Sequence, residues 1–309
     1  MKQPEVTYIV APICDKFLYR FVTTLHKFSE PNSYRLIVVD QIKNGMPNEL
    51  WQSIKDKVHL YIHPPLHQLG FSKAMNLGTI IALNQGTPLI CLANDDIEII
   101  NSKWMDGIHK TFDLDPRIVG VCPMSLRHAG FGYGVDYNPE ILPYKEEYTD
   151  EEYNFLVNGD FSKVDTKLPN TFPRQMKGTV VDGAAFIMPY FKREIFEEVG
   201  LLDERFWPGS GEDYCMMARI YAKNKRVVSS SYSWIFHYWS KSKDLFAATE
   251  LENEYYRPKN KEYFADWEKL YPPELNEGHK PDIWGHYTNE KGEKIPLKRD
   301  PLIFVDDLI

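Results

Sequence analysis

The feature that most constrains this chain is the alternation of short apolar runs with segments of helical periodicity over its first 125 residues. Three segments carry apolar residues at helical spacing, namely residues 17–28, 72–84 and 104–112. Short apolar runs that end at polar or proline-containing turns are typical of buried strands, and they cover residues 6–11, 36–39, 58–62, 88–93 and 118–122. Strands that alternate with helices predict an α/β fold with a mainly parallel sheet and right-handed crossovers.

The rest of the chain divides into an irregular segment, a second structured part and a tail. Residues 126–178 are rich in Gly, Tyr, Pro and acidic residues, and we expect an insertion or lid over the site. Regular structure returns over residues 179–245, and residues 246–309 are expected to form a C-terminal helix and an extended tail. The sequence therefore predicts one domain over residues 1–245, whose first half is residues 1–125.

The second structured part begins with strand-like runs at residues 179–181 and 184–188. Helices are expected over residues 192–199 and 212–224, because apolar residues recur there at helical spacing. A β-like run of Ser and aromatic residues then leads to His237.

Composition and charge exclude several classes of protein. With 43% hydrophobic and 26% charged residues, the 309-residue chain can bury a core and is not disordered. The net charge of -8 counts against a protein that holds duplex DNA by its phosphates. No apolar run approaches the roughly 20 residues that cross a bilayer, and the start of the chain has no signal-peptide pattern. The four cysteines form no C-x-x-C pair, so we expect reduced thiols in a cytoplasmic protein.

Acidic residues follow three of the predicted strands. Asp15, Asp40 and the pair Asp95 and Asp96 all come after strand ends, and the carboxyl ends of parallel strands meet at the edge where ligands bind. No G-x-G-x-x-G motif follows the first strand and the chain has no P-loop motif. An ordinary dinucleotide or P-loop site is therefore not expected.

The run Asn94-Asp95-Asp96 is the strongest local signal for chemistry. Adjacent carboxylates at a strand end present hard oxygen ligands for Mg²⁺ or Mn²⁺. A turn or a helix cap explains the same residues equally well. His237 is of interest as a further ligand beside Asp96, although a single histidine is more often a packed or surface residue.

Two other acidic positions are candidates. Glu212 and Asp213 open a predicted helix after a Pro-Gly-Ser-Gly run, so they fit either a general base beside a loop or carboxylates stabilised by the helix dipole. Asp182 lies next to Gly183 within an apolar run, where a carboxylate needs partners or a pocket to offset the cost of burial.

Taken in chain order, these motifs resemble the inverting nucleotide-sugar glycosyltransferases of family 2, which have the GT-A fold. The matching segments are residues 9–12 (IVAP), 36–40 (LIVVD), 70–78 (GFSKAMNLG), 92–96 (LANDD), 181–185 (VDGAA), 200–204 (GLLDE), 211–215 (GEDYC) and 236–237 (FH). Residues 260–267 also resemble the tail helix of rhamnosyltransferase-like members. The resemblance implies a Rossmann-like mixed, mainly parallel sheet flanked by helices, with an inserted loop region and a C-terminal helical or extended tail.

The resemblance also implies a role for each matching residue. Asp40 would pair with the nucleotide base and Asp95 would contact the ribose. Asp96, with His237, would bind Mn²⁺ or Mg²⁺ at the diphosphate. Asp213 would be the general base, with Glu212 beside it in the acceptor pocket. The residues implied to form the nucleotide-sugar site are Pro12, Ile13, Asp15, Asp40, Lys73, Asn76, Asn94, Asp95, Asp182 and Gly183.

The function implied is metal-dependent transfer of a hexosyl or deoxyhexosyl group from a UDP-, dTDP- or GDP-linked donor to a hydroxyl of a glycan, a lipid-linked or another acceptor. Residues 1–125 would bind the donor and residues 179–245 would form the acceptor and catalytic half. Three alternatives stay open. One is transfer to a modified nucleic-acid base, which the acidic net charge counts against. The others are a non-catalytic binding protein with this fold and a nucleotidyltransferase, although no Gly-rich phosphate loop is found near the first strand.

Overall fold

The structure is a computed structural model. It describes residues 4–30, 32–42, 44–64, 69–99, 102–125, 180–209, 211–237, 286–288 and 294–296. The expected insertion at residues 126–178, the tail helix at 260–267 and most of the tail lie outside the described residues, so these predictions are not addressed by the structure.

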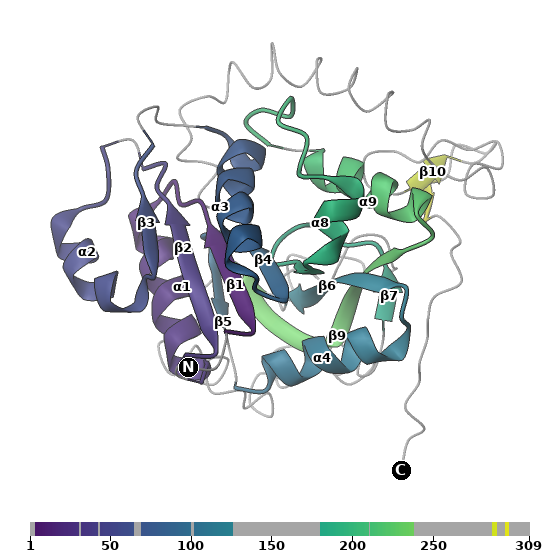
Figure 1. The fold of residues 1–309 in the computed structure, drawn as a ribbon, viewed down its shortest axis with the longest axis horizontal. Coiled ribbons are helices and arrows are strands. Elements are labelled where there is room, and N and C mark those ends of the chain that lie inside the picture. The colour runs from purple at the N-terminus through teal and green to yellow at the C-terminus, as the bar shows by residue number, and fades with distance from the viewer. Residues whose placement is uncertain are drawn as a thin grey trace.

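A nine-stranded sheet forms the centre of the protein (Figure 1). Its path runs in the order β3-β2-β1-β4-β8-β6-β9-β5, and β7 pairs with β9 beside this path. The strands are β1 (Val6–Val10), β2 (Tyr34–Val39), β3 (Leu60–Ile62), β4 (Leu89–Ala93), β5 (Ile97–Ile99), β6 (Ile118–Ser125), β7 (Val180–Asp182), β8 (Tyr190–Lys192) and β9 (Arg226–His237). Strands β1 to β4, β6 and β9 run in one direction, and β5, β7 and β8 in the other. The predicted mixed, mainly parallel sheet is confirmed.

Six α-helices are present among the described residues. They are α1 (Asp15–Phe28), α2 (Asn48–Ile54), α3 (Phe71–Gln85), α4 (Trp104–Leu114), α8 (Glu194–Val199) and α9 (Glu212–Ala222). Five of these helices fall where apolar residues recur at helical spacing. Helix α2, seven residues long, was not predicted. A single 3₁₀ turn, Lys55–Lys57, follows it, and the two-stranded hairpin of β10 (His286–Thr288) and β11 (Lys294–Pro296) lies apart from the main sheet.

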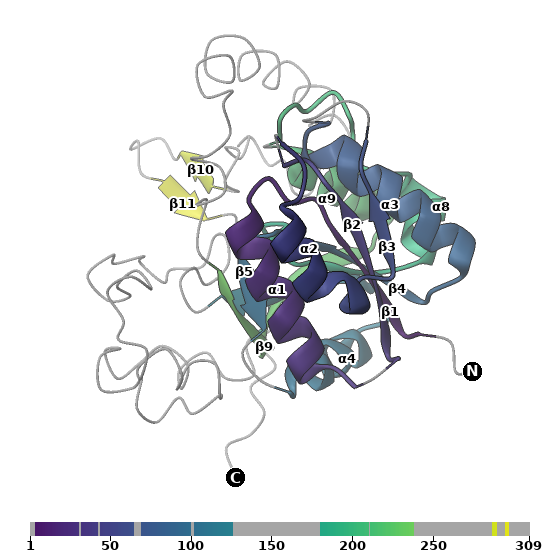
Figure 2. The same cartoon turned by 90° about the vertical axis from the view of Figure 1, so that its left-hand side faces the viewer.

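The alternation of side chains along β1 explains how helices cover both faces of the sheet. Ile9 points towards α3, where Gly78 leaves so little room that a Cβ atom there would lie 2.4 Å from Cγ2 of Ile9. Tyr8 points to the opposite face and packs against Trp104 of α4, with ring centroids 5.9 Å apart. Helices α3, α8 and α9 therefore lie on one face and α1 and α4 on the other (Figure 2).

One predicted strand is wrong. Residues 184–188 form an irregular turn, and the strand is instead β8, three residues long, which inserts antiparallel between β4 and β6. The chain leaves β7 through Gly183, whose φ of 88° lies in the left-handed region that glycine adopts most readily. Most of the apolar run 184–188 is buried, and burial without strand pairing produces the same apolar pattern.

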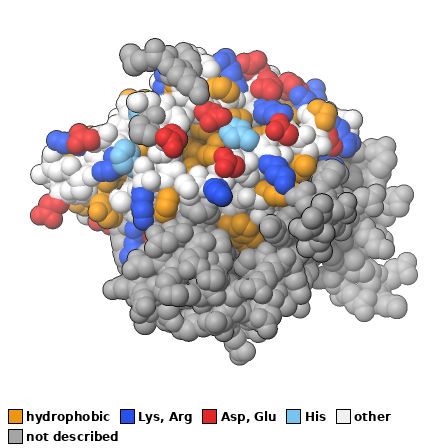
Figure 3. Space-filling model, turned by 90° about the horizontal axis from the view of Figure 1, so that it is seen from below, with side chains coloured by type: hydrophobic (Ala, Val, Ile, Leu, Met, Phe, Trp, Pro, Cys, Tyr) orange, Lys and Arg blue, Asp and Glu red, His pale blue; other side chains and the backbone are white. Residues whose placement is uncertain are grey.

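The surface carries charges of both signs. On the face shown in Figure 3, acidic and basic side chains of the described residues are interspersed around exposed apolar surface, and neither sign forms a continuous patch. None of the described helices is both long enough and apolar enough to cross a membrane.

Candidate functional site

The carboxyl ends of the parallel strands bring the predicted residues to one edge of the sheet. Pro12 follows β1, Asp40 follows β2, Asp96 follows β4 and His237 ends β9. Strands β2, β1 and β4 are direct neighbours in register, so their loops lie side by side. The general rule for ligand sites in α/β sheets places a binding site here.

Asp96 and His237 meet although 141 residues separate them. Strand β5 pairs antiparallel with β9 so that Ile97 lies opposite His237, and the preceding residue Asp96 then faces the imidazole. Nε2 of His237 lies 3.0 Å from Oδ1 of Asp96, and the two residues are only 5% and 2% exposed. Oδ2 of Asp96 is buried and has no hydrogen-bond partner among the described residues. A buried carboxylate oxygen left unpaired is costly, so this pair is suited to bind a cation.

Asp95 stabilises the loop between β1 and α1. Its Oδ2 accepts hydrogen bonds from the backbone N–H groups of Ile13 (3.0 Å) and Cys14 (3.3 Å), directly before α1 begins at Asp15. A carboxylate at a helix N-terminus is favoured by the helix dipole and pairs N–H groups that lack helical partners. The ribose contact of Asp95 stays a prediction, and the carboxylate has this structural task in addition.

Asp40 is fully buried and organises the loop that follows β2. Its carboxylate is approached by four groups, the backbone N–H of Ile42 (2.9 Å), the backbone N–H of Met46 (3.1 Å), the hydroxyl of Tyr61 (2.6 Å) and Nδ1 of His63 (3.3 Å). Burial and the hydrogen bond to Asp40 raise the pKa of Tyr61, so the phenol stays protonated and donates. Three of these groups approach Oδ2, whereas the N–H of Ile42 is the one described donor to Oδ1. Each carboxylate oxygen has about two acceptor positions, so Oδ2 is saturated and Oδ1 is not. The base contact of Asp40 stays a prediction.

Gln41 connects three loops at the same edge. Its backbone N–H donates to the carbonyl of Pro12 (3.0 Å), and its Oε1 accepts from the N–H of Gly70 (3.0 Å), the residue that precedes α3. The side chain is almost completely buried. The sequence analysis gave this position no role, because a glutamine after a strand end carries no sequence signal for burial.

Asp213 lies at the start of α9, beside Glu212. Its Oδ1 accepts a hydrogen bond from the N–H of Tyr214 (2.7 Å), and the backbone of Phe186 also favours the charged carboxylate. Burial raises the pKa of Asp213 above its ordinary value, and these backbone hydrogen bonds offset that effect only in part. A raised pKa makes the carboxylate a stronger base.

Residues 186 and 187 connect the two halves of the site. The carbonyl of Ile187 accepts a hydrogen bond of 2.9 Å from the N–H of Asn94, whereas the backbone of its neighbour Phe186 acts on the carboxylate of Asp213. Asp213 is thus linked through two adjacent residues to the run that contains Asp96. The irregular turn at 184–188, which was predicted as a strand, is what makes this link possible.

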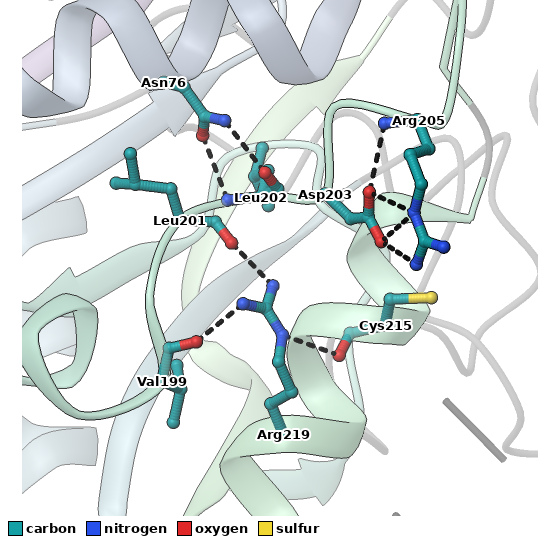
Figure 4. A network of polar contacts seen from close by, with 8 residues as sticks. All are labelled: Asn76, Val199, Leu201, Leu202, Asp203, Arg205, Cys215 and Arg219. Carbon is teal, nitrogen blue, oxygen red and sulfur yellow. Dashed lines mark hydrogen bonds and ion pairs between the residues drawn. The ribbon is translucent and has the colours of Figure 1, made fainter. Parts of the chain in front are cut away.

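The amide of Asn76 is fully engaged with other parts of the protein (Figure 4). Its amide hydrogen-bonds both backbone groups of Leu202 and the carboxylate of Glu204. Donor binding by Asn76 stays a prediction, but the contacts seen are with the protein itself. Arg219, which was not singled out from the sequence, contacts the same loop from α9.

The remaining predicted donor-site residues have few described contacts. Asp15 and Lys73 are exposed, Ile13 and Asn94 are half-buried, and Gly183 has open space where a side chain would be. The backbone of Asp182 ends β7 opposite Val228, and its side chain lies outside the described part of the structure. Their roles in donor binding stay predictions.

Several solved structures have a similar fold. One is the mannosyltransferase PcManGT from Pyrobaculum calidifontis in complex with GDP-Man and Mn²⁺, with 15% identity, a TM-score of 0.49, and coverage of 78% of this chain and 59% of that one. Another is S. aureus TarS 1-349, with 12% identity, a TM-score of 0.48, and coverage of 85% of this chain and 70% of that one. A third is GalNAc-T7 with UDP, GalNAc and Mn²⁺, with 14% identity, a TM-score of 0.49, and coverage of 94% of this chain and 63% of that one. This chain thus spans less than two thirds of the mannosyltransferase and of GalNAc-T7. No protein-family model matches the sequence, and no curated protein matches it. At these levels of similarity, function has to be inferred from the residues of this chain.

Proposed function

We propose that this protein is a metal-dependent inverting glycosyltransferase, which moves a sugar from a nucleotide-diphosphate donor to an acceptor hydroxyl. The observation that carries the proposal is the buried pair of Asp96 and His237 at the carboxyl edge of the sheet. This pair joins two of the motifs that resemble family 2 glycosyltransferases, residues 92–96 and 236–237. The base predicted from a third motif, Asp213, lies in the first turn of α9.

The residues present fit a divalent cation. Oδ2 of Asp96 is a buried carboxylate oxygen without a described partner, and a carboxylate together with an imidazole suits Mn²⁺. Among the described residues, no group of three or more His, Cys, Asp or Glu side chains could hold a metal. Asp96 and His237 would therefore supply two ligands, and the remaining positions would be filled by diphosphate oxygens and water. A cation bound there would neutralise the charge that develops on the leaving diphosphate.

Asp213 would remove the proton of the acceptor hydroxyl as that oxygen attacks the anomeric carbon. The attack comes from the face opposite to the leaving diphosphate, so a single displacement inverts the configuration and needs no covalent intermediate. The raised pKa of Asp213 supports this role, because a base whose pKa lies nearer to the operating pH accepts a proton more readily. Glu212, which is buried beside it, would contribute to the acceptor pocket.

A thermal-shift panel tests the proposal. UDP, GDP, dTDP, CMP and their common sugar conjugates are each added with Mn²⁺ or with EDTA, and a ligand that binds only the folded state raises Tm by mass action. We expect a metal-dependent rise with one nucleotide family, and its loss in Asp96→Ala and His237→Ala. The control Asp113→Ala removes an exposed carboxylate of α4 and should leave the rise unchanged.

Three outcomes would contradict the proposal. A rise that persists in Asp96→Ala with Mn²⁺ would mean that the metal site is elsewhere. Binding without transfer to any acceptor hydroxyl, and without hydrolysis of the donor, would favour the non-catalytic binding protein. Salt-sensitive binding of DNA would favour transfer to a nucleic-acid base.

A further inference from the structure

The segment that leads into the proposed catalytic helix has no regular structure of its own. Residues 200–209 join α8 to the start of α9, and none of them belongs to a helix or a strand. Such a segment is held in place by side chains from neighbouring elements, because backbone ladders do not fix it. Its position matters, because Glu212 and Asp213 follow almost immediately.

Asn76 holds this segment from α3. Its Oδ1 accepts from the N–H of Leu202 (3.0 Å), and its Nδ2 donates to the carbonyl of Leu202 (2.8 Å) and to Oε1 of Glu204 (3.0 Å). The amide thus pairs with both backbone groups of one residue, 126 positions along the chain. Asn76 is only 3% exposed, and an amide offers one acceptor oxygen and two N–H donors. Each of these groups has a protein partner, so the amide is used in fixing the loop.

Arg219 holds the same segment from the other side, as Figure 4 shows. Its guanidinium donates to the carbonyls of Val199 (2.6 Å), Leu201 (2.7 Å) and Cys215 (3.3 Å). Arg219 and Cys215 both belong to α9, so the helix that carries Asp213 is tied directly to residues 199–201. Burial lowers the pKa of Arg219 from its very high ordinary value. Its guanidinium is a planar group with several donors, whose geometry a lysine could not reproduce.

The far end of the segment rests on the start of α3. The N–H of Phe71 donates to the carbonyl of Pro208 (2.7 Å). A Cβ atom on Gly70 would lie 2.7 Å from Cδ1 of Trp207, so only glycine allows this close approach. Gly70 is also the residue bound by Gln41, which connects to the loop after β1. A continuous set of contacts therefore runs from the predicted nucleotide loops to the start of α9.

We infer that Asn76 and Arg219 are positioning residues, which fix the start of α9 and so set the orientation of Asp213 relative to the donor. The inference rests on the proposed function, and it changes the role of Asn76: sequence similarity implies a donor ligand, whereas the contacts join the donor half to the catalytic half. Asn76 acts on the chemical step through residues 200–209, without touching substrate.

Steady-state kinetics and donor titration on Asn76→Ala test the inference. We expect kcat to fall at least about ten-fold, since small displacements of a catalytic group are costly, while the donor Kd stays within two-fold. The pKa on the acid side of the kcat profile should fall, because a loosened α9 start hydrates Asp213 and reduces the effect of burial. Arg219→Lys should show the same pattern and provides a second variant if Asn76→Ala folds poorly.

Two control variants separate positioning from general damage. Ala82→Gly weakens the same helix without removing a side-chain hydrogen bond, and Asn84→Ala removes an exposed amide from its last turn. Both should leave kcat and the acid-side pKa unchanged. An increase in donor Kd with unchanged kcat in Asn76→Ala would restore the donor-ligand role, and an equal loss of kcat in Ala82→Gly would reduce Asn76 to a structural residue.

Hydrogen exchange separates this inference from the proposed function. If the wild-type protein shows no transfer at all, the proposed function fails, but the amides of residues 200–209 still report on the contacts. Faster exchange of these amides in Asn76→Ala than in Ala82→Gly is expected. Equal exchange in the two variants would overturn the inference whatever the activity.

Discussion

Replacement of Asp213 by asparagine provides the sharpest single test of the mechanism. A general base contributes roughly 10²–10⁴-fold to the rate, so kcat should fall by a factor in this range. The effect on stability should be small because two changes oppose each other. Asparagine keeps an oxygen acceptor for the N–H of Tyr214 but loses the charge that strengthens this hydrogen bond, which is destabilising. Asparagine also removes the negative charge whose burial raises the pKa of Asp213, which is stabilising. We expect the free energy of unfolding to change by less than about 1 kcal/mol, since the lost charge-assisted hydrogen bond is worth a similar amount.

The assay combines kcat at saturating donor, donor titration and the pH dependence of kcat. In the wild type, kcat should fall as the pH drops through the pKa of Asp213, and that pKa should lie above the ordinary value of about 3.9 for an aspartate. This acid limb should disappear in Asp213→Asn, with donor affinity nearly unchanged. If donor affinity collapses, Asp213 is a donor ligand or a structural residue, and the assignment of the base is refuted.

Two further predictions concern the fold around the site. In Asp40→Asn, either the amide nitrogen replaces the oxygen that Met46, Tyr61 and His63 approach, or the side chain turns away from these groups. Buried donors left unpaired cost about 1–3 kcal/mol each, so chemical denaturation should show a loss of about 2–4 kcal/mol in the free energy of unfolding. An unchanged midpoint would contradict the described geometry. Gly78→Ala gains about 1 kcal/mol of helix propensity but places a Cβ atom 2.4 Å from Cγ2 of Ile9, and overpacking costs about 1–3 kcal/mol, so Tm should fall. In an Ile9→Ala background the same change should no longer destabilise, and a fall of equal size there would show that the contact is not the cause.

The sheet and most helices could be predicted because their signals are local. The run at residues 6–11 and the helical spacing at 72–84 each contain enough apolar residues to fix the element type. Strand β8 could not be predicted, because three residues carry too little periodicity and because the neighbouring apolar run at 184–188 is buried without being a strand. Apolar patterns report burial, and burial is not always strand pairing.

The chemical types in the site could be predicted, but their contacts could not. The family pattern selected Asn76 as a donor-site residue. Its observed partner Leu202 is 126 residues away and binds through backbone atoms that carry no sequence signal. Arg219 shows the same difficulty. A basic side chain on a helix is usually solvated, and only the fold reveals that this guanidinium binds the carbonyls of Val199 and Leu201.

Asp95 and Asp96 have different surroundings although they are neighbours in one motif. Helix capping and cation binding were open alternatives for this run. In the structure Asp95 binds the N–H groups before α1, whereas Asp96 faces His237, where we propose that a cation binds. The division links the two tasks physically. Movement of Asp95 would shift the β1–α1 loop, whose Pro12 carbonyl binds Gln41, and the same backbone displacement would move Asp96. A ligand that orders the nucleotide loops would therefore also order the proposed cation site, which explains why metal and nucleotide are expected to bind together.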